Sequence, residues 1–167
     1  MQYYRPVDGY QQHLEKTVML FDADIIDYHN LFNVAEQEIS IFTGSNDMEY
    51  ADEFIKAACS FSAIRGSCLK IACQCGQRMD QCEILKAILS APGRQGEIMV
   101  YDAHDFLGEP YFILADETAY RVEIPALAET ILDYDDQNEI FRLHARFQHI
   151  LQVSSLTAHA LPLSETN

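Results

Sequence analysis

Two apolar patterns, each with alternating spacings of four and three residues, occupy the first half of the chain and constrain its fold most strongly. The first covers residues 14–42 and the second covers residues 50–75. Side chains at these spacings lie on one stripe of an α-helix, which must then pack against other helices. The patterns therefore predict two long helices, over about residues 9–43 and 46–75.

A short polar segment separates the two expected helices. Gly44 favours the left-handed backbone conformation that ends many helices. Asn46 and Glu49 have the spacing of a capping box, in which each side chain bonds to the backbone N–H of the other residue. Because the connection is short, the two helices are expected to form an antiparallel hairpin.

The apolar pattern changes its period in the second half of the chain. Alternating residues and short apolar runs predict three strands, at Glu97–Asp102, Tyr111–Ala115 and Ala119–Ile124. Their connections indicate an antiparallel meander over about residues 97–124. Asp136 and Glu139 form another capping box, and the apolar stripe after them predicts a last helix that ends near Ser155.

We therefore expect an α+β fold that is mainly α. It is a helical bundle built on a long N-terminal helical hairpin, with a small three-stranded antiparallel sheet before the last helix. A chain of 167 residues fits a single domain, placed at residues 1–156, with a flexible tail at 157–167. No apolar run reaches the roughly 20 residues of a membrane helix, and no secretory signal pattern is present.

The five cysteines lie between Cys59 and Cys82. Their odd number does not match a secreted disulfide framework, and reduced thiols are typical of the cytoplasm. Cys73 and Cys75 would point away from each other on a helix, so they could not share a metal. None of the six histidines has a metal-binding spacing. We expect reduced cysteines, a cytoplasmic location, no cofactor and no metal.

Acidic residues are concentrated between Glu97 and Glu139. This segment holds twelve acidic residues and one basic residue, a net charge of −11 out of −15 for the chain. A surface of one sign attracts basic partners and repels nucleic acid and anionic membranes. Aromatic residues between the acids are typical of protein interfaces. The residues expected to bind a partner are Tyr101, Asp102, Asp105, Glu109, Asp116, Glu117, Asp133, Tyr134, Asp135 and Asp136.

A different hypothesis comes from residues 21–24, Phe-Asp-Ala-Asp, which follow an apolar run. They resemble the nucleophile motif of haloacid-dehalogenase-type phosphatases, in which two carboxylates act as nucleophile and general acid with magnesium. Residues 41–44 resemble the second motif of that family and residues 101–105 its acidic metal motif. The chain departs from the family after Asp24, where two isoleucines replace a glycine and a threonine.

The chain contains no P-loop, no glycine-rich dinucleotide motif and no serine-nucleophile motif. The favoured function is therefore a non-enzymatic one, an acidic inhibitor or immunity-type protein that neutralises a basic partner such as a toxin or nuclease. Nucleases must be basic to hold phosphates, so their blockers are often acidic. The alternatives are a magnesium-dependent phosphatase that uses Asp22 and Asp24, and a homo-oligomeric helical scaffold or chaperone.

Overall fold

The computed structural model describes residues 31–43, 51–74, 83–106, 111–124, 129–133 and 136–163. The strands are β1 (Glu38–Thr43), β2 (Cys68–Cys73), β3 (Glu97–Asp102), β4 (Tyr111–Ala115), β5 (Ala119–Ile124), β6 (Glu129–Asp133) and β7 (Ser155–Ala160). The helices are α3 (Ala51–Ser62), α4 (Glu83–Leu89) and α5 (Gln137–Val153), with a 3₁₀ turn, η2, at His104–Phe106. Residues 31–34 are also helical.

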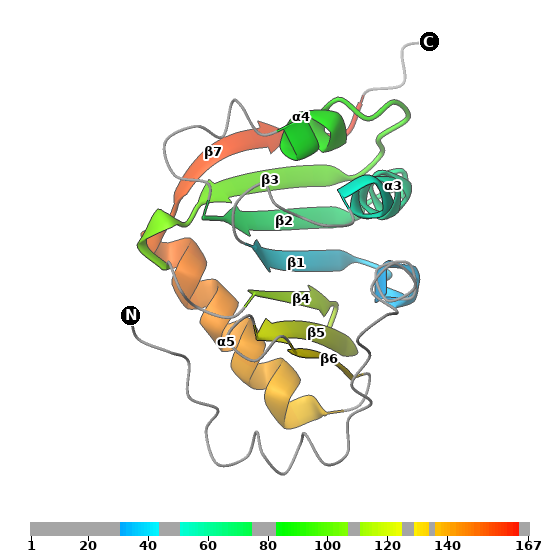
Figure 1. Cartoon of the computed structure of the whole chain (residues 1–167). Helices are drawn as coiled ribbons and strands as arrows, with labels where there is room; N and C mark the ends of the chain where they lie inside the picture. Colours follow the sequence, from blue (N-terminus) through cyan, green and yellow to red (C-terminus); the bar gives the residue numbers. More distant parts are fainter. Residues whose placement is uncertain are drawn as a thin grey trace.

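The strands form one mixed sheet in the order β6-β5-β4-β1-β2-β3-β7 (Figure 1). The central strands β1, β2 and β3 are parallel, whereas β4 pairs antiparallel with β1, and β7 pairs antiparallel with β3. The three parallel strands therefore end at one end of the sheet, called the carboxyl end below. They begin at the opposite, amino end.

Each face of the sheet packs against helices. The first face and helices α3 and α4 share one apolar cluster, which includes Ile39, Ile71 and Phe61. The second face packs against α5, and the rings of Phe112 and Phe147 meet there at 6.2 Å between centroids. Figure 1 shows α5 running beside β4–β6 and ending next to η2 and the start of β7. This arrangement brings the last turns of α5 to the carboxyl end.

The expected mainly helical bundle is wrong, because β1 and β2 lie where the hairpin was predicted. Both strands are central in the sheet and are buried on both faces, so their apolar residues do not alternate cleanly. A short apolar run of this kind also fits a helical spacing. Gly66, with φ of 79°, lies between α3 and β2, so the helix ends before it. Residues 9–30, 46–50 and 75 of the hairpin prediction lie outside the described residues.

The bounds predicted for β3, β4 and β5 are confirmed, but their arrangement as a three-stranded meander is wrong. Strands β4 and β5 form a hairpin, whereas β3 pairs with β2 and β7 instead. The last helix is confirmed, and the Asp136 side chain accepts a hydrogen bond from Glu139 N at 3.0 Å. Residues 157–160, expected in a tail, belong to β7.

Cys73 is disulfide-bonded, so the expectation that all cysteines are reduced is wrong at this position. That expectation assumed a helix through residue 75, whereas Cys73 is the last residue of β2. Cys59 and Cys68 are free, and burial raises the pKa of both thiols. Within the described segments, no helix is long and apolar enough to cross a bilayer.

Candidate functional site

A histidine flanked by two carboxylates lies at the carboxyl end of the sheet. His104 begins η2, directly beyond β3. Its Nδ1 atom is 3.1 Å from Asp102 Oδ2, and its Nε2 atom is 3.3 Å from Asp105 Oδ1. The ring is 58% exposed, whereas the Asp102 side chain is 19% exposed. In open α/β sheets, ligands bind beyond the carboxyl ends of the parallel strands, which is where this histidine lies.

Backbone and amide hydrogen bonds hold the η2 turn against the end of β2. Ala103 N donates to Cys73 O at 2.8 Å, and Phe106 N donates to Ala103 O at 3.1 Å. The side chain of Gln74, which is buried, donates from Nε2 to Phe106 O. Asp102 Oδ1 also accepts from His104 N at 3.2 Å. The position of His104 is therefore determined by bonds on both sides of it.

Helix α5 brings two further nitrogen-rich side chains to the same turn. The Phe106 ring meets the His149 ring edge-on, with 5.9 Å between centroids. The guanidinium of Arg146 lies over the Phe106 ring, 5.2 Å from its centroid, as in a cation–π contact. Because Phe106 itself is buried, it serves as the contact point between η2 and α5. The sheet and helix together place one arginine and two histidines at this end.

This arrangement is suited to proton transfer beside an anion. A carboxylate on one imidazole nitrogen fixes the orientation of the ring and leaves the other nitrogen to exchange a proton. For His104 the fixing partner is Asp102, since Asp105 is 68% exposed and can turn aside. Arg146 supplies positive charge nearby. Among the described residues, no group of three or more His, Cys, Asp or Glu side chains could hold a metal.

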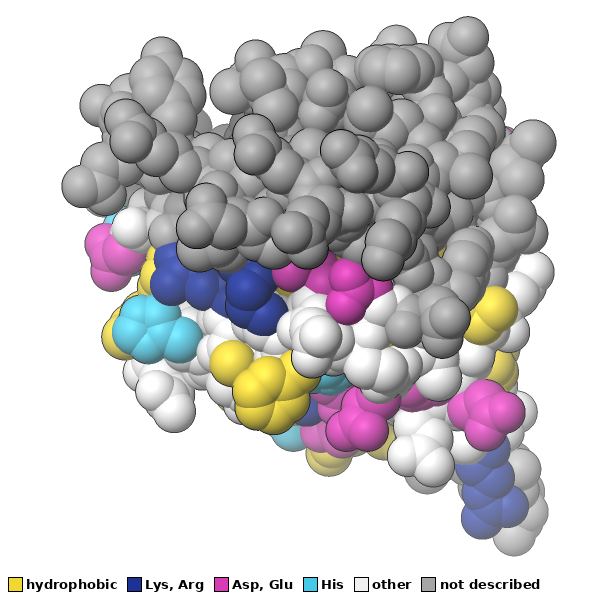
Figure 2. Space-filling model, turned by 90° about the horizontal axis from the view of Figure 1, so that it is seen from below, with side chains coloured by type: hydrophobic (Ala, Val, Ile, Leu, Met, Phe, Trp, Pro, Cys, Tyr) yellow, Lys and Arg dark blue, Asp and Glu magenta, His cyan; other side chains and the backbone are white. Residues whose placement is uncertain are grey.

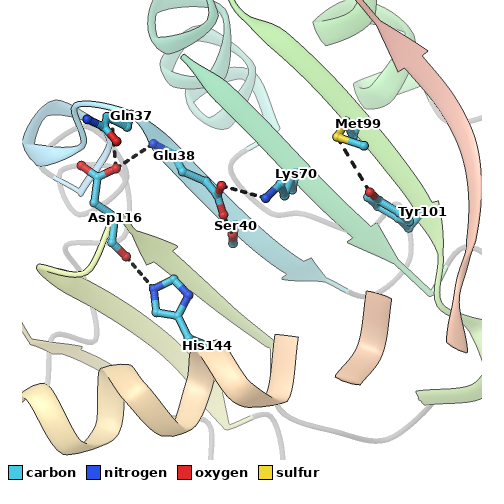
Figure 3. A network of polar contacts seen from close by, with 8 residues as sticks. All are labelled: Gln37, Glu38, Ser40, Lys70, Met99, Tyr101, Asp116 and His144. Atoms are coloured by element: carbon cyan, nitrogen blue, oxygen red, sulfur yellow. Dashed lines mark hydrogen bonds and ion pairs between the residues drawn. The ribbon is translucent and has the colours of Figure 1, made fainter. Parts of the chain in front are cut away.

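A row of polar side chains crosses the three parallel strands, from Glu38 at the start of β1 to Tyr101 near the end of β3 (Figure 3). Lys70 on β2 forms an ion pair with Glu38 on β1, with 2.7 Å between Nζ and Oε2. The buried Ser40 hydroxyl donates to Glu38 Oε1 at 2.9 Å. On β3, the Tyr101 hydroxyl points to Met99 Sδ at 3.8 Å. Lys70 is therefore already neutralised by a carboxylate within the sheet.

Two pKa values in this row differ from their ordinary values. Burial lowers the pKa of Lys70, but its hydrogen bond and ion pair with Glu38 outweigh burial, so the pKa is raised overall. Burial raises the pKa of the Tyr101 hydroxyl, and the positive charge of Lys70 opposes that shift only in part. Both groups therefore keep their protons at neutral pH.

The residues expected to bind a partner are divided between the two ends of the sheet. Tyr101, Asp102 and Asp105 come together at the carboxyl end. Asp116 and Glu117 lie in the β4–β5 turn at the amino end. The remaining positions are Asp133 at the end of β6, Asp136 at the start of α5, and Glu109, Tyr134 and Asp135, which lie outside the described residues. Figure 2 shows acidic, basic and histidine side chains next to one another on the described part of one face.

Sequence reasoning overlooked four residues of this site. His104 was overlooked because none of the six histidines has a metal-binding spacing, although acids on both sides of this one were visible. Gln74, Arg146 and His149 have no local signal of function. They reach the turn only because β2 and α5 end beside β3.

The structure is similar to several solved proteins. The first is Nuc from Salmonella typhimurium, a phospholipase D family member, with a TM-score of 0.60 at 12% identity, covering 79% of this chain and 89% of Nuc. NucT from Helicobacter pylori gives 0.54 at 14% identity, covering 84% and 96%. The archaeal chromatin protein TrmBL2, whose structure shows a novel mode of DNA binding, gives 0.53 at 16% identity. That match covers 89% of this chain but only 61% of TrmBL2. By sequence, no protein-family model and no curated protein matches the chain.

These similarities correct the functional expectations drawn from sequence. The fold is one found in the phospholipase D family and in a DNA-binding chromatin protein. The immunity-type inhibitor of a basic toxin and the haloacid-dehalogenase-type phosphatase are therefore both wrong. The exclusions of an enzyme and of a nucleic-acid partner are also wrong. Asp22 and Asp24 of the phosphatase hypothesis lie outside the described residues.

Proposed function

We propose that this chain is a phosphodiesterase domain whose leading substrate is the backbone of nucleic acid. The observation that supports this most is the placement of His104, with Asp102 behind it and Arg146 close by, beyond the parallel strands. Two similarities support the choice of substrate. A phospholipase D by name cleaves a phosphodiester, and TrmBL2, which shares the fold, binds DNA.

The proposed reaction is hydrolysis. A water oxygen forms a bond to phosphorus as the ester P–O bond breaks, which yields a phosphomonoester and an alcohol. His104 Nε2 either takes the proton from the attacking water or gives one to the leaving oxygen, while Nδ1–H donates to Asp102. Arg146 stabilises the charge that develops on the phosphoryl oxygens, which is the main task of an enzyme in phosphoryl transfer.

The test measures hydrolysis of three phosphodiesters by the purified chain: bis(4-nitrophenyl) phosphate, a single-stranded DNA oligonucleotide and phosphatidylcholine vesicles. We expect cleavage of the first two. His104→Gln should lower the rate roughly 100- to 10,000-fold, because general acid–base groups contribute about that much. Cleavage of the vesicles alone would reassign the substrate to a lipid headgroup.

The matched control is His159→Gln. His159 is also an exposed histidine in contact with a carboxylate, Glu97, but it lies on the edge strand β7 away from η2. This variant should retain activity within about twofold. The proposal is overturned if the wild type cleaves none of the substrates, if it binds DNA without cleaving it, or if a folded His104→Gln variant stays fully active.

A further inference from the structure

We infer that Gln74 is a positioning residue for the candidate site. Its buried side chain fixes the η2 turn against the end of β2, and this sets where the His104 ring stands relative to Asp102. The inference rests on the proposed function for its effect on hydrolysis. Its effect on the His104 ring is measured without any activity.

The backbone of Gln74 is held among the central strands. Gln74 directly follows β2, and its N–H donates to the carbonyl oxygen of Thr43, the last residue of β1, at 3.0 Å. The residue before it, Cys73, accepts a hydrogen bond at 2.8 Å from the N–H of Ala103, directly beyond β3. The Gln74 side chain therefore starts from a rigid point, as a side chain must if it is to hold another segment in place.

The side-chain amide of Gln74 closes the far end of the turn. Its Nε2 atom donates to Phe106 O, and Phe106 is the last residue of η2. Carbonyl groups at the end of a helical turn need partners from outside the turn, and the amide supplies one. Cys73 and Gln74 thus hold the turn on both sides of His104, through Ala103 N and Phe106 O.

The ring contacts of Phe106 do not fix the turn in the same way. The ring meets the Phe42 and His149 rings edge-on, at 6.3 and 5.9 Å between centroids. Aromatic pairs are favourable over a range of about 4.5–7 Å, so these contacts tolerate small shifts. A hydrogen bond is directional and weakens steeply when its angle changes. Loss of the Gln74 bond should therefore let the turn move while the Phe106 ring stays buried.

Movement of the turn would separate His104 from Asp102. Asp102 belongs to β3 and stays with the sheet, whereas His104 belongs to η2 and its ring is 58% exposed. The Nδ1 and Oδ2 atoms of the pair are 3.1 Å apart, so a small displacement of the turn breaks their contact. A misplacement of about 1 Å in an active site can lower a rate about 100-fold.

The experiment compares Gln74→Met with a matched control. Gln74→Met keeps the length of the side chain and removes the donor, so kcat for bis(4-nitrophenyl) phosphate should fall roughly 10- to 100-fold, with KM within about twofold. The control is Ser67→Ala, because Ser67 is also buried and donates to the carbonyl oxygens of Phe61 and Ile64, but at the amino end. It should leave kcat and KM within about twofold of the wild type. The NMR signals of the His104 ring should shift in Gln74→Met and not in Ser67→Ala.

Gln74→Glu tests the donor itself. A protonated carboxyl group at this position can donate its O–H to Phe106 O, whereas an ionised one has no donor. The activity of Gln74→Glu divided by that of Gln74→Met at the same pH should therefore rise as the pH falls. If Gln74→Met does not fold, the activity of Gln74→Glu relative to the wild type must show this rise instead.

The outcomes separate this inference from the proposed function. If the wild type cleaves no phosphodiester, the proposed function fails and the NMR comparison decides the inference, which is overturned when the His104 signals do not move in Gln74→Met. If the wild type is active, a folded Gln74→Met variant with kcat within about twofold of the wild type overturns the inference. An equal loss of kcat in Ser67→Ala overturns it as well, and so does an activity ratio for Gln74→Glu that does not change with pH.

Discussion

An aspartate lies at each end of the parallel strands, but the two carboxylates have different hydrogen-bond partners. At the amino end, the Asp116 carboxylate accepts hydrogen bonds from three consecutive backbone N–H groups, those of Glu36, Gln37 and Glu38, at 2.6, 3.1 and 2.6 Å. At the carboxyl end, Asp102 accepts one backbone bond, and its other oxygen faces an exposed histidine ring. Figure 3 shows Asp116 between the start of β1 and the helical residue His144.

The difference shows how one sheet separates stability from chemistry. A carboxylate whose oxygens are occupied by backbone N–H groups holds the chain in place and has little capacity left for a ligand. Asp116 has a φ of 49°, and His144 Nε2 bonds its carbonyl oxygen at 2.7 Å, so even its backbone is fixed by neighbours. Asp102 instead orients a side chain that solvent can reach. Substitutions at the amino end should therefore lower stability, whereas substitutions at the carboxyl end should lower activity.

The largest loss of stability is expected from Gly96→Ala at the amino end. A Cβ atom on Gly96 would lie 2.0 Å from Ser67 Oγ and 2.7 Å from Ser67 O. The hydroxyl cannot move away easily, because it donates to Phe61 O and Ile64 O. We expect the free energy of unfolding to fall by about 3 kcal/mol, at the upper end for overpacking. Urea denaturation measures this.

Gly93→Ala is the matched control, because a Cβ atom there meets nothing within 4 Å. Its φ of 71° alone makes alanine unfavourable, which costs roughly 1–2 kcal/mol. An equal fall in the free energy of unfolding for the two variants would mean that Ser67 moves aside and that the amino end is loosely packed.

Asp116→Ala is expected to have the next largest effect on stability. It removes the acceptor for three N–H groups at the start of β1, so the free energy of unfolding should fall by about 2–3 kcal/mol. Asp116→Asn should lose about half as much, since asparagine keeps one oxygen acceptor and tolerates a positive φ. If the two variants are equally unstable, the negative charge of Asp116 rather than its geometry is what matters.

Asp102→Asn should show the opposite pattern. Its carboxylate accepts one long backbone hydrogen bond at 3.2 Å, so the free energy of unfolding should change by less than about 0.5 kcal/mol. Phosphodiester hydrolysis should nevertheless fall at least tenfold, because the ring of His104 loses its fixing charge. A stability loss as large as that of Asp116→Ala would show that the carboxyl end is also a structural clamp.

The smallest effect concerns Lys70, which lies between the two ends. Its pKa is raised above 10.5 in the folded chain by Glu38, so its stabilising contribution is complete below that pH. The contribution is lost as pH rises through the folded pKa. Lys70→Met should therefore flatten the fall of stability between pH 10 and 12, measured by urea denaturation. The pKa of Tyr101 is also raised, so its ionisation adds to the fall of stability at high pH. Tyr101→Phe removes this contribution and serves as the comparison for Lys70→Met.

Sequence predicted β3 and α5 well because each has one exposed side, and it also predicted the bounds of β4, although β4 is buried on both faces. Asp136 marks the start of α5 through its side-chain bond. Strands β1 and β2 were missed because their apolar residues also fit the four-three helical spacing that runs through residues 14–42 and 50–75. A local sequence pattern cannot show that a strand will be covered on both faces of the sheet.

The candidate site was predictable only where it is local. Asp102 and Asp105 were named from sequence, but as residues that bind a basic protein partner, and the intervening His104 was not named. Gln74 contacts Phe106 across 32 residues of sequence, and Arg146 comes from a helix near the other end of the chain. Such partners are set by the order of the strands, which follows from long-range packing rather than from spacing.

The pairing of β7 with β3 has a consequence for the synthesis of the protein. Glu97 on β3 meets His159 on β7 across 62 residues, so the outer edge of β3 gains its ladder only after those further residues have left the ribosome. Until then its backbone N–H and C=O groups are open to pairing with other chains. Sheets that depend on such distant contacts also fold slowly. The synthesis of β7 therefore determines how long this edge of the nascent chain is exposed to aggregation.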